Sequence, residues 1–181
     1  WSSPTVVNGT VYVADDTRYD SSTQSYAGGY LYALDAETGT ERWRYDIDAY
    51  DSRGDDYRRF GASGSFPVAN GTIYFADENA TVHAVDVESG DADWTVHAYE
   101  DEGDFEHAEF DYGPAIVNGT LYVQETDGEL YAIDAATGQT EWRVETTRFG
   151  VRSGLAVGNS TVFTGGYDAD RYRYQLIAYH A

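Results

Sequence analysis

An eleven-residue segment occurs three times in this chain. The copies "ALDAETGTERW" at 33–43, "AVDVESGDADW" at 84–94 and "AIDAATGQTEW" at 132–142 keep Ala, Asp, Gly and Trp at the same offsets. The copies begin 51 and 48 residues apart, close to the roughly 40–50 residues of one propeller blade. A fixed period of this length predicts repeated units, each burying its apolar face against its neighbours.

A second recurring signal lies upstream of each copy. Asn-Gly-Thr occupies 8–10, 70–72 and 118–120, and Asn-Ser-Thr occupies 159–161 as a looser fourth copy. Short alternating apolar runs flank each triplet, as in "PTVV" before and "VYVAD" after the first. Two such runs joined by Asn-Gly predict a β-hairpin, because Asn and Gly tolerate the positive φ of a type I′ turn.

Two more strands complete each unit. The third carries "YLYALD", "TVHAVD", "ELYAID" and "YQLIAYH", and after a Thr-Gly or Ser-Gly turn the Trp lies on a fourth. No segment sustains the 3.6-residue period of a helix. The sequence therefore predicts an all-β fold, a β-propeller of four-stranded antiparallel blades with about four blades present. We expect one propeller segment over 1–181, with blades at approximately 2–47, 64–98, 112–147 and 152–181, the last incomplete because it lacks its outer strand.

The repeated pattern Ala-x-Asp-x-x-Thr-Gly-x-x-x-Trp resembles the tryptophan-docking motif of the pyrroloquinoline-quinone (PQQ) repeat family. Ser89 replaces Thr in the second copy, and His180 stands where a fourth copy would have Asp. We interpret the motif residues as structural, with each Trp packing on the neighbouring blade. These docking residues are Asp35, Gly39, Trp43, Asp86, Gly90, Trp94, Asp134, Gly138 and Trp142.

The resemblance implies a ring of seven or eight blades, so four blades would form an open arc. Exposed blade edges associate readily. Two alternatives remain open: a fragment of a larger propeller, or a chain that pairs with a second copy as a homodimer of eight blades. Its first residue is Trp1 rather than Met, and we expect an excised or processed piece of something longer.

The charge balance is extreme. Thirty-two acidic residues face eleven basic ones, all of them Arg, and the formal net charge is −21. At molar salt the Debye length falls to about 3 Å, which screens most of this self-repulsion. The composition predicts a halophilic protein, with an ordinary acidic protein as the alternative. It argues against nucleic acid as a partner, since phosphates would meet a negative field.

Other features of the sequence exclude further kinds of protein. The chain has no cysteine, which excludes a disulfide framework and a thiol nucleophile. No apolar run approaches the roughly 18 residues of a membrane span, and no signal peptide is recognisable. The N-glycosylation triplets at Asn8, Asn70, Asn79, Asn118 and Asn159 would mark an exported protein if modified. Hairpin turns explain four of these triplets equally well.

All long connections fall between the second and third strands or between blades, which places them at one end of the propeller. Long loops on a rigid scaffold commonly carry function, and Arg and Tyr are enriched in interface hot spots. The alternative is that these arginines neutralise nearby acids. The predicted binding face comprises Arg18, Tyr26, Tyr50, Arg53, Tyr57, Arg58, Arg59, Arg148, Arg152, Arg171, Tyr172 and Arg173.

The family that the chain resembles also includes the quinoprotein dehydrogenases. These enzymes bind PQQ with calcium, a Trp platform and usually a vicinal cysteine pair. Here there is no cysteine, and the four tryptophans are Trp1 and the three docking residues. No G-x-S-x-G, P-loop or H-E-x-x-H motif is present either. We therefore expect no cofactor and a protein-interaction or ligand-binding scaffold outside the cell or on its surface, as the resemblance to the family's outer-membrane-protein assembly factors implies. The alternative is a quinoprotein fragment whose cofactor residues lie elsewhere.

The sequence contains two candidate metal sites. A loop crowded with carboxylates suits calcium, although its spacing is not that of an EF-hand. His97, Glu106 and His107 form a weak zinc pattern. The calcium candidates are Asp46, Asp48, Asp51, Asp55 and Asp56.

Overall fold

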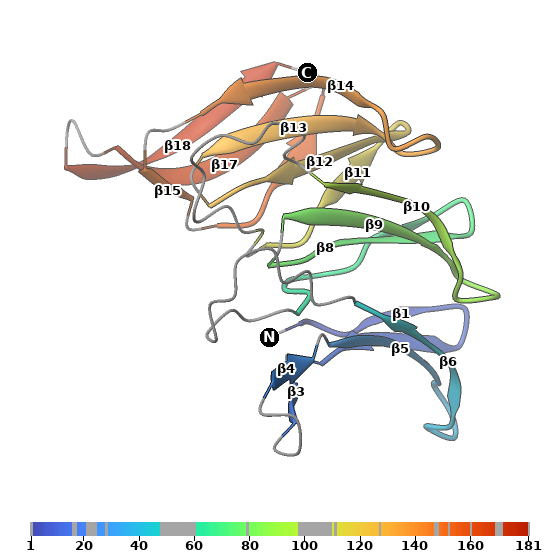
Figure 1. Ribbon diagram of the computed structural model, residues 1–181. Coiled ribbons are helices and arrows are strands. Elements are labelled where there is room, and N and C mark those ends of the chain that lie inside the picture. The colour runs from blue at the N-terminus through green and yellow to red at the C-terminus, as the bar shows by residue number, and fades with distance from the viewer. Residues whose placement is uncertain are drawn as a thin grey trace.

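The computed structural model is all-β over the residues that it describes (Figure 1). Four sheets are stacked one on the next in chain order as an open arc of propeller blades, the architecture that the repeat predicts. The described residues are 2–15, 18–20, 25–27, 29–47, 61–78, 80–97, 110, 112–126, 128–146, 149–151, 153–159, 161–168 and 172–180.

The first sheet is an antiparallel meander in the order β1-β2-β5-β6, and a separate hairpin of β3 and β4 lies within its second connection. The hairpin projects from the sheet in Figure 1. The bounds are β1 Thr5–Val7, β2 Thr10–Ala14, β3 Arg18–Asp20, β4 Ser25–Ala27, β5 Tyr30–Asp35 and β6 Glu41–Asp46.

The second and third sheets repeat the same meander without an extra hairpin among the described residues. In all three sheets the outer strand carries a bulge next to its Trp. Their strands are β7 Val68–Ala69, β8 Thr72–Ala76, β9 Thr81–Asp86, β10 Ala92–His97, β11 Ala115–Val117, β12 Thr120–Gln124, β13 Glu129–Asp134 and β14 Thr140–Glu145.

The fourth sheet differs in its inner edge. Two short strands, β15 and β16, pair with successive halves of the long strand β17, and β18 pairs with the other side of β17. β15 begins before residue 152, earlier than the expected start of this blade. The bounds are β15 Phe149–Val151, β16 Ala156–Gly158, β17 Thr161–Asp168 and β18 Arg173–His180.

The repeated turns have the predicted chemistry. The four hairpin asparagines adopt positive φ, at 48° for Asn8, 53° for Asn70 and Asn118, and 50° for Asn159. A residue at such an angle must be Asn, Asp or Gly to avoid strain, which is why each triplet begins with Asn.

The docking aspartates cap the next turn. Asp134 Oδ1 accepts hydrogen bonds from the backbone N–H groups of Ala136 and Thr137 and from the Thr137 hydroxyl. Asp35 and Asp86 accept backbone bonds at the equivalent positions. These bonds close the turn that carries each outer strand back along its sheet.

Apolar side chains fill the space between successive sheets. Period-two alternation in β8, β9, β12 and β13 sends one set of residues to each face, and both faces are buried because each sheet has a neighbour on each side. The core between the first and second sheets includes Tyr12, Leu31, Phe66, Phe75 and Val85. The two ends of the arc lack this cover, and large apolar residues are exposed there: Val6, Phe163, Tyr174 and Leu176.

Candidate functional site

The two ends of the strands have different connections. Short turns join first strands to second and third to fourth, whereas the long connections leave from the opposite end of every sheet, at the left in Figure 1. We call this opposite end the loop-bearing end. The described residues that bound it include Asp15, Ala62, Asp77, Phe110 and Glu125.

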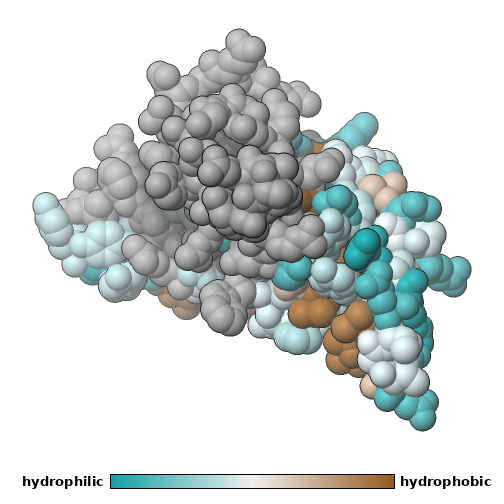
Figure 2. Space-filling view, turned by 60° about the horizontal axis from the view of Figure 1, so that its bottom comes forward, coloured by the Kyte–Doolittle hydropathy of each residue, from teal (hydrophilic) through white to brown (hydrophobic). Residues whose placement is uncertain are grey.

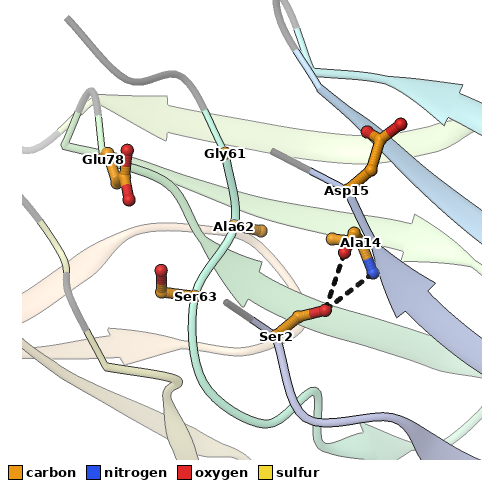
Figure 3. A pocket seen from close by; sticks show the side chains of 7 residues that line it. All are labelled: Ser2, Ala14, Asp15, Gly61, Ala62, Ser63 and Glu78. Atoms are coloured by element: carbon orange, nitrogen blue, oxygen red, sulfur yellow. Dashed lines mark hydrogen bonds between the residues drawn. The ribbon is translucent and has the colours of Figure 1, made fainter. Parts of the chain in front are cut away.

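A small cavity lies at the loop-bearing end between the first and second sheets (Figure 3). Only about 10 Å³ admits the centre of a water molecule, so the cavity suits a single water rather than a substrate. Ser2 forms part of the cavity wall. The Ser2 hydroxyl donates to the Ala14 carbonyl at 2.8 Å and accepts from the Ala14 N–H at 3.0 Å. The cavity is lined by Ser2, Ala14, Asp15, Gly61, Ala62, Ser63 and Glu78.

An acidic residue recurs directly after the second strand in three sheets. Asp15, Asp77 and Glu125 each donate their N–H to the carbonyl of the first residue of the third strand, at 3.0, 2.9 and 2.8 Å. Asp77 is 2% exposed and Glu125 is 1% exposed. Their carboxylates therefore belong to the folded framework of the loop-bearing end. The acid is visible in the sequence as the last letter of "VYVAD", "IYFAD" and "LYVQE", but no local pattern indicates its role.

The side chain facing this acid is on the third strand. Asp15 Oδ2 accepts from the Tyr32 hydroxyl at 3.1 Å, and Asp77 Oδ2 lies 3.0 Å from His83 Nε2. Tyr131 occupies the same register position in the third sheet, where burial is the main cause of its raised pKa and its hydroxyl donates to Glu129 Oε2 at 2.5 Å. In the first two sheets this contact joins the acid after the second strand to the third strand, whereas the Tyr131–Glu129 hydrogen bond lies within β13.

His83 joins two sheets through both ring nitrogens. Its Nε2 faces Asp77, and its Nδ1 lies 3.1 Å from the hydroxyl of Tyr45 in β6 of the first sheet. The ring stacks on Phe75 with centroids 4.5 Å apart and is 5% exposed. The order Tyr–His–Asp resembles a catalytic relay. The small cavity does not reach His83, however, so the arrangement is a buried interblade contact.

The docking tryptophans are engaged in the same structural way. Trp43 Nε1 donates to the Val87 carbonyl at 3.0 Å, and Trp94 Nε1 donates to the Ala135 carbonyl at 3.1 Å. Trp142 packs on the core formed with the fourth sheet around Val162. PQQ would need an exposed Trp platform, and none of these three supplies one. The described residues therefore do not form a cradle for PQQ.

The predicted binding face lies mostly outside the described residues. The structure describes Tyr172, 84% exposed, and the exposed Arg173 at the start of β18. It places the backbone of Arg18 in β3 and of Tyr26 in β4, two residues of the projecting hairpin. The remaining predicted positions, outside the described residues, are Tyr50, Arg53, Tyr57, Arg58, Arg59, Arg148, Arg152 and Arg171.

The predicted metal ligands are likewise only partly covered. Among the described residues, no group of three His, Asp or Glu side chains is arranged to hold a metal ion. Asp46 is exposed at the end of β6, and the other calcium candidates, Asp48, Asp51, Asp55 and Asp56, lie outside the described residues. His97 Nδ1 is 3.2 Å from the Thr81 hydroxyl, whereas Glu106 and His107 are not described. In the same described portion, no helix is long and apolar enough to cross a membrane.

Comparison with known proteins places the architecture in context. A family model described as outer membrane protein assembly factor BamB matches residues 27–173. The curated BamB of Moranella endobia (strain PCIT) is 34% identical over 93 residues, which are 51% of this chain and 21% of that protein. The chain thus matches about a fifth of this relative's length.

Solved structures agree in fold. The crystal structure of BamB from Moraxella catarrhalis has a TM-score of 0.63 at 19% identity, covering 98% of this chain and 44% of that one. The quinohemoprotein alcohol dehydrogenase of Comamonas testosteroni has a TM-score of 0.67 at 17% identity, covering 99% of this chain and 34% of that one. Identities this low establish the propeller architecture alone, which an assembly factor and a dehydrogenase share.

Proposed function

Since the chain belongs to the PQQ-type repeat family described as outer membrane protein assembly factor BamB, we propose that it is a non-catalytic scaffold that binds a protein of the cell envelope through its loop-bearing end. One observation carries this proposal, namely the asymmetry between the two ends of the strands. At one end Asn-Gly turns and Thr-Gly or Ser-Gly turns close the hairpins of the first three sheets with their own hydrogen bonds. At the other end lie all the long connections and the β3–β4 hairpin.

The polar groups of the described framework support a scaffold over an enzyme. His83, the best-placed acid–base residue among them, has Asp77 and Tyr45 at its two nitrogens and lies beneath the surface. The cavity beside Asp15 and Glu78 has room for about one water. A binding surface needs neither an open general base nor a substrate pocket, only a rigid support for its loops.

The composition supports a setting of high salt outside the cell. A net charge of −21 on 181 residues without lysine is best tolerated where salt screens repulsion. The exposed Asn8, Asn70 and Asn118 would lie at the end opposite the loops, so modification there would leave the proposed binding end free.

The test is site-specific photo-crosslinking in the source organism. A benzophenone side chain replaces Tyr172 at the loop-bearing end or Tyr57 in the chain segment between β6 and β7, with matched replacements of Glu37 and Asn118 at the turn end as controls. We expect the first pair to crosslink one discrete envelope protein and the controls to crosslink none. Equal labelling from both ends, or no discrete product from Tyr57 and Tyr172, would contradict the proposal.

The dehydrogenase alternative has a separate readout. The purified chain is titrated with PQQ in the presence of calcium chloride in a calorimeter. We expect no saturable heat, because none of the docking indoles forms a platform. Stoichiometric binding would favour a quinoprotein and overturn the non-catalytic assignment.

A further inference from the structure

A threonine and a docking aspartate face each other across the ladder in each of the first three sheets. These cross-strand pairs are Thr10–Asp35, Thr72–Asp86 and Thr120–Asp134. They lie at the turn end, which is the end of the strands opposite the loop-bearing end, and Figure 2 shows hydrophilic residues projecting there at the right of the view. The turn hydrogen bonds go to Oδ1 of each Asp, so Oδ2 is the oxygen available for other contacts.

A third side chain reaches each pair from the bulge of the outer strand. The residues that the bulge leaves out of the ladder, directly before the docking Trp, are Arg42, Asp93 and Glu141. Asp93 Oδ2 accepts from the Thr72 hydroxyl at 3.0 Å. Glu141 Oε2 accepts from the Thr120 hydroxyl at 3.3 Å. The bulge therefore brings a charged side chain to the same place in all three sheets.

In the first sheet this side chain is a cation. Arg42 Nη1 donates to the Thr10 hydroxyl at 2.7 Å. Its Nη2 donates to Asp35 Oδ2 at 2.7 Å and to the Gly9 carbonyl at 3.3 Å. The guanidinium is also the first cause of the lowered pKa of Asp35. The first sheet thus shows that this hydroxyl, carboxylate and carbonyl together hold a positive charge.

The second and third sheets keep the same three oxygen donors. The carbonyls of Gly9, Gly71 and Gly119 each accept a backbone hydrogen bond at 2.9 Å from the residue after the docking Asp, so they occupy equivalent positions. The threonine and the docking Asp are equivalent by register. Only the bulge residue differs, because it is an acid in place of Arg42.

This exchange reverses the local charge. Hydrogen bonds from the Ser89 N–H and from the Thr137 hydroxyl are the first causes of the lowered pKa values of Asp86 and Asp134, so both carboxyls are ionised at neutral pH. The bulge acid adds a second carboxylate beside the same threonine. Within the described part of the chain, neither Asp86 nor Asp134 forms an ion pair. Two negative charges thus flank a position that a guanidinium fills in the first sheet.

We propose that the second and third sheets each bind a hard divalent cation at the position that the guanidinium of Arg42 occupies in the first. The ligands are four oxygens: the docking carboxylate, the bulge carboxylate, the threonine hydroxyl and the glycine carbonyl. Oxygen donors of this kind suit a calcium-like ion. The threonine hydroxyl can donate to the bulge acid and still present a lone pair to the ion.

The charge of the site selects the valence of the ion. The first sheet sets one carboxylate against one positive charge, whereas each of the other two sets two carboxylates against the ion. The two sites comprise Gly71, Thr72, Asp86 and Asp93 in the second sheet, and Gly119, Thr120, Asp134 and Glu141 in the third. Each ion joins the ends of three strands, so binding stabilises the folded sheet. Both sites lie away from the loop-bearing end, so the crosslinking result and this proposal can fail separately.

The test is a calorimetric titration of calcium chloride into the chelator-treated chain. About 2 M sodium chloride is present throughout, because molar salt screens non-specific attraction to the acidic surface. We expect two sites with dissociation constants of about 0.1–1 mM, the range of extracellular calcium modules. At about 10 mM calcium, each filled site should then lower the unfolding constant at least about tenfold.

Substitutions at the bulge assign the two sites. Asp93→Arg copies Arg42 into the second sheet, and Glu141→Arg does so in the third. We expect each variant to lose one site together with its calcium-dependent stabilisation. Asp91→Arg is the matched control, since it makes the same charge change at an exposed turn residue and should keep both sites. Arg42→Asp makes the converse change and should add a third site in the first sheet.

Three results would overturn the proposal. The first is the absence of saturable calcium heat, which includes the case of a site that prefers the sodium already present. The second is calcium binding that Asp93→Arg and Glu141→Arg both leave unchanged, because the ion would then lie elsewhere. The third is an equal loss of binding in Asp91→Arg. If either arginine variant does not fold, Asp93→Asn and Glu141→Gln replace them, and each should lose one site.

Discussion

The indole N–H of Trp43 donates to the backbone carbonyl of Val87 at 3.0 Å, across the interface between the first and second sheets. Trp94 repeats the contact one sheet later, with Ala135 at 3.1 Å. These residues are 44 and 41 positions apart in the chain. The repeated tryptophan therefore joins neighbouring blades in two ways: it hydrogen-bonds to the turn of the next sheet, and it packs on that turn.

Removing only the indole N–H tests that contact. We expect Trp43→Phe to lower the free energy of unfolding by about 1 kcal/mol, the usual net value of one hydrogen bond. Trp43→Ala should cost about 3 kcal/mol, because it also removes the packed ring. Denaturant unfolding at constant high salt measures both. A Trp43→Phe chain as stable as the parent would show that packing alone holds the interface.

The glycine beneath the ring makes a matched prediction. Gly138→Ala combines positive φ with a Cβ 2.8 Å from the Trp94 indole, whereas Gly119→Ala has positive φ and open space. We expect about 1 kcal/mol of destabilisation for Gly119→Ala and about 2–3 kcal/mol for Gly138→Ala. Equal losses at the two positions would mean that the indole moves aside without cost.

Substitution of the buried His83 should destabilise the protein more than the sequence alone would suggest. His83→Phe keeps the stacking volume against Phe75 but removes the partner of the Asp77 carboxylate and of the Tyr45 hydroxyl. We expect a loss of about 2–4 kcal/mol. Tyr45→Phe is the milder control, since it removes one hydroxyl and should cost about 1 kcal/mol. A His83→Phe protein of parental stability would rule out a structural role for the pair.

The lowered pKa values of the docking aspartates predict that the folded protein loses stability in acid. The Arg42 side chain is the first cause of the lowered pKa of Asp35, the Ser89 N–H that of Asp86, and the Thr137 hydroxyl that of Asp134. A carboxyl with a lowered folded-state pKa contributes stability above its unfolded pKa of about 3.9, and this contribution is lost as pH falls through the folded value. We therefore expect stability to decline below about pH 4.

Replacing one carboxyl isolates its share of this decline. Asp134→Asn should be less stable than the parent at pH 6, and its stability should depend less on pH between 4 and 2. Unfolding curves collected in molar salt at several pH values measure both effects. Parallel pH profiles for parent and variant would contradict the assignment.

Salt dependence tests the proposed setting. With a net charge of −21, we expect the thermal midpoint to rise steadily between about 0.1 and 2 M sodium chloride, as screening relieves self-repulsion. Potassium chloride at equal ionic strength is the control for a specific ion. A midpoint that does not change with salt would favour an ordinary acidic protein.

The sequence by itself determined the strands, their turns and their repetition. Asn70 and Gly71 between alternating apolar runs strongly favour a tight hairpin, and alternation in "IYFAD" and "TVHAVD" sets the faces of β8 and β9. Turn chemistry and period-two alternation act over a few residues, so both can be predicted locally. The identity of the docking residues follows from repetition in the same way. The binding role of loop residues such as Tyr57 and Arg58 remains a prediction.

Only the tertiary structure decided what those residues contact. No local pattern indicates that Trp43 finds the carbonyl of Val87, that Tyr45 reaches His83, or that Gly39 alone among the three motif glycines has open space beside it. These contacts join residues about 40 positions apart, and they exist only after neighbouring sheets have stacked. Stacking of neighbouring sheets buries His83 and Asp77, whereas Val6, on the outer side of the first sheet, stays exposed. Whether a sheet face is buried or exposed therefore depends on the packing of the blades.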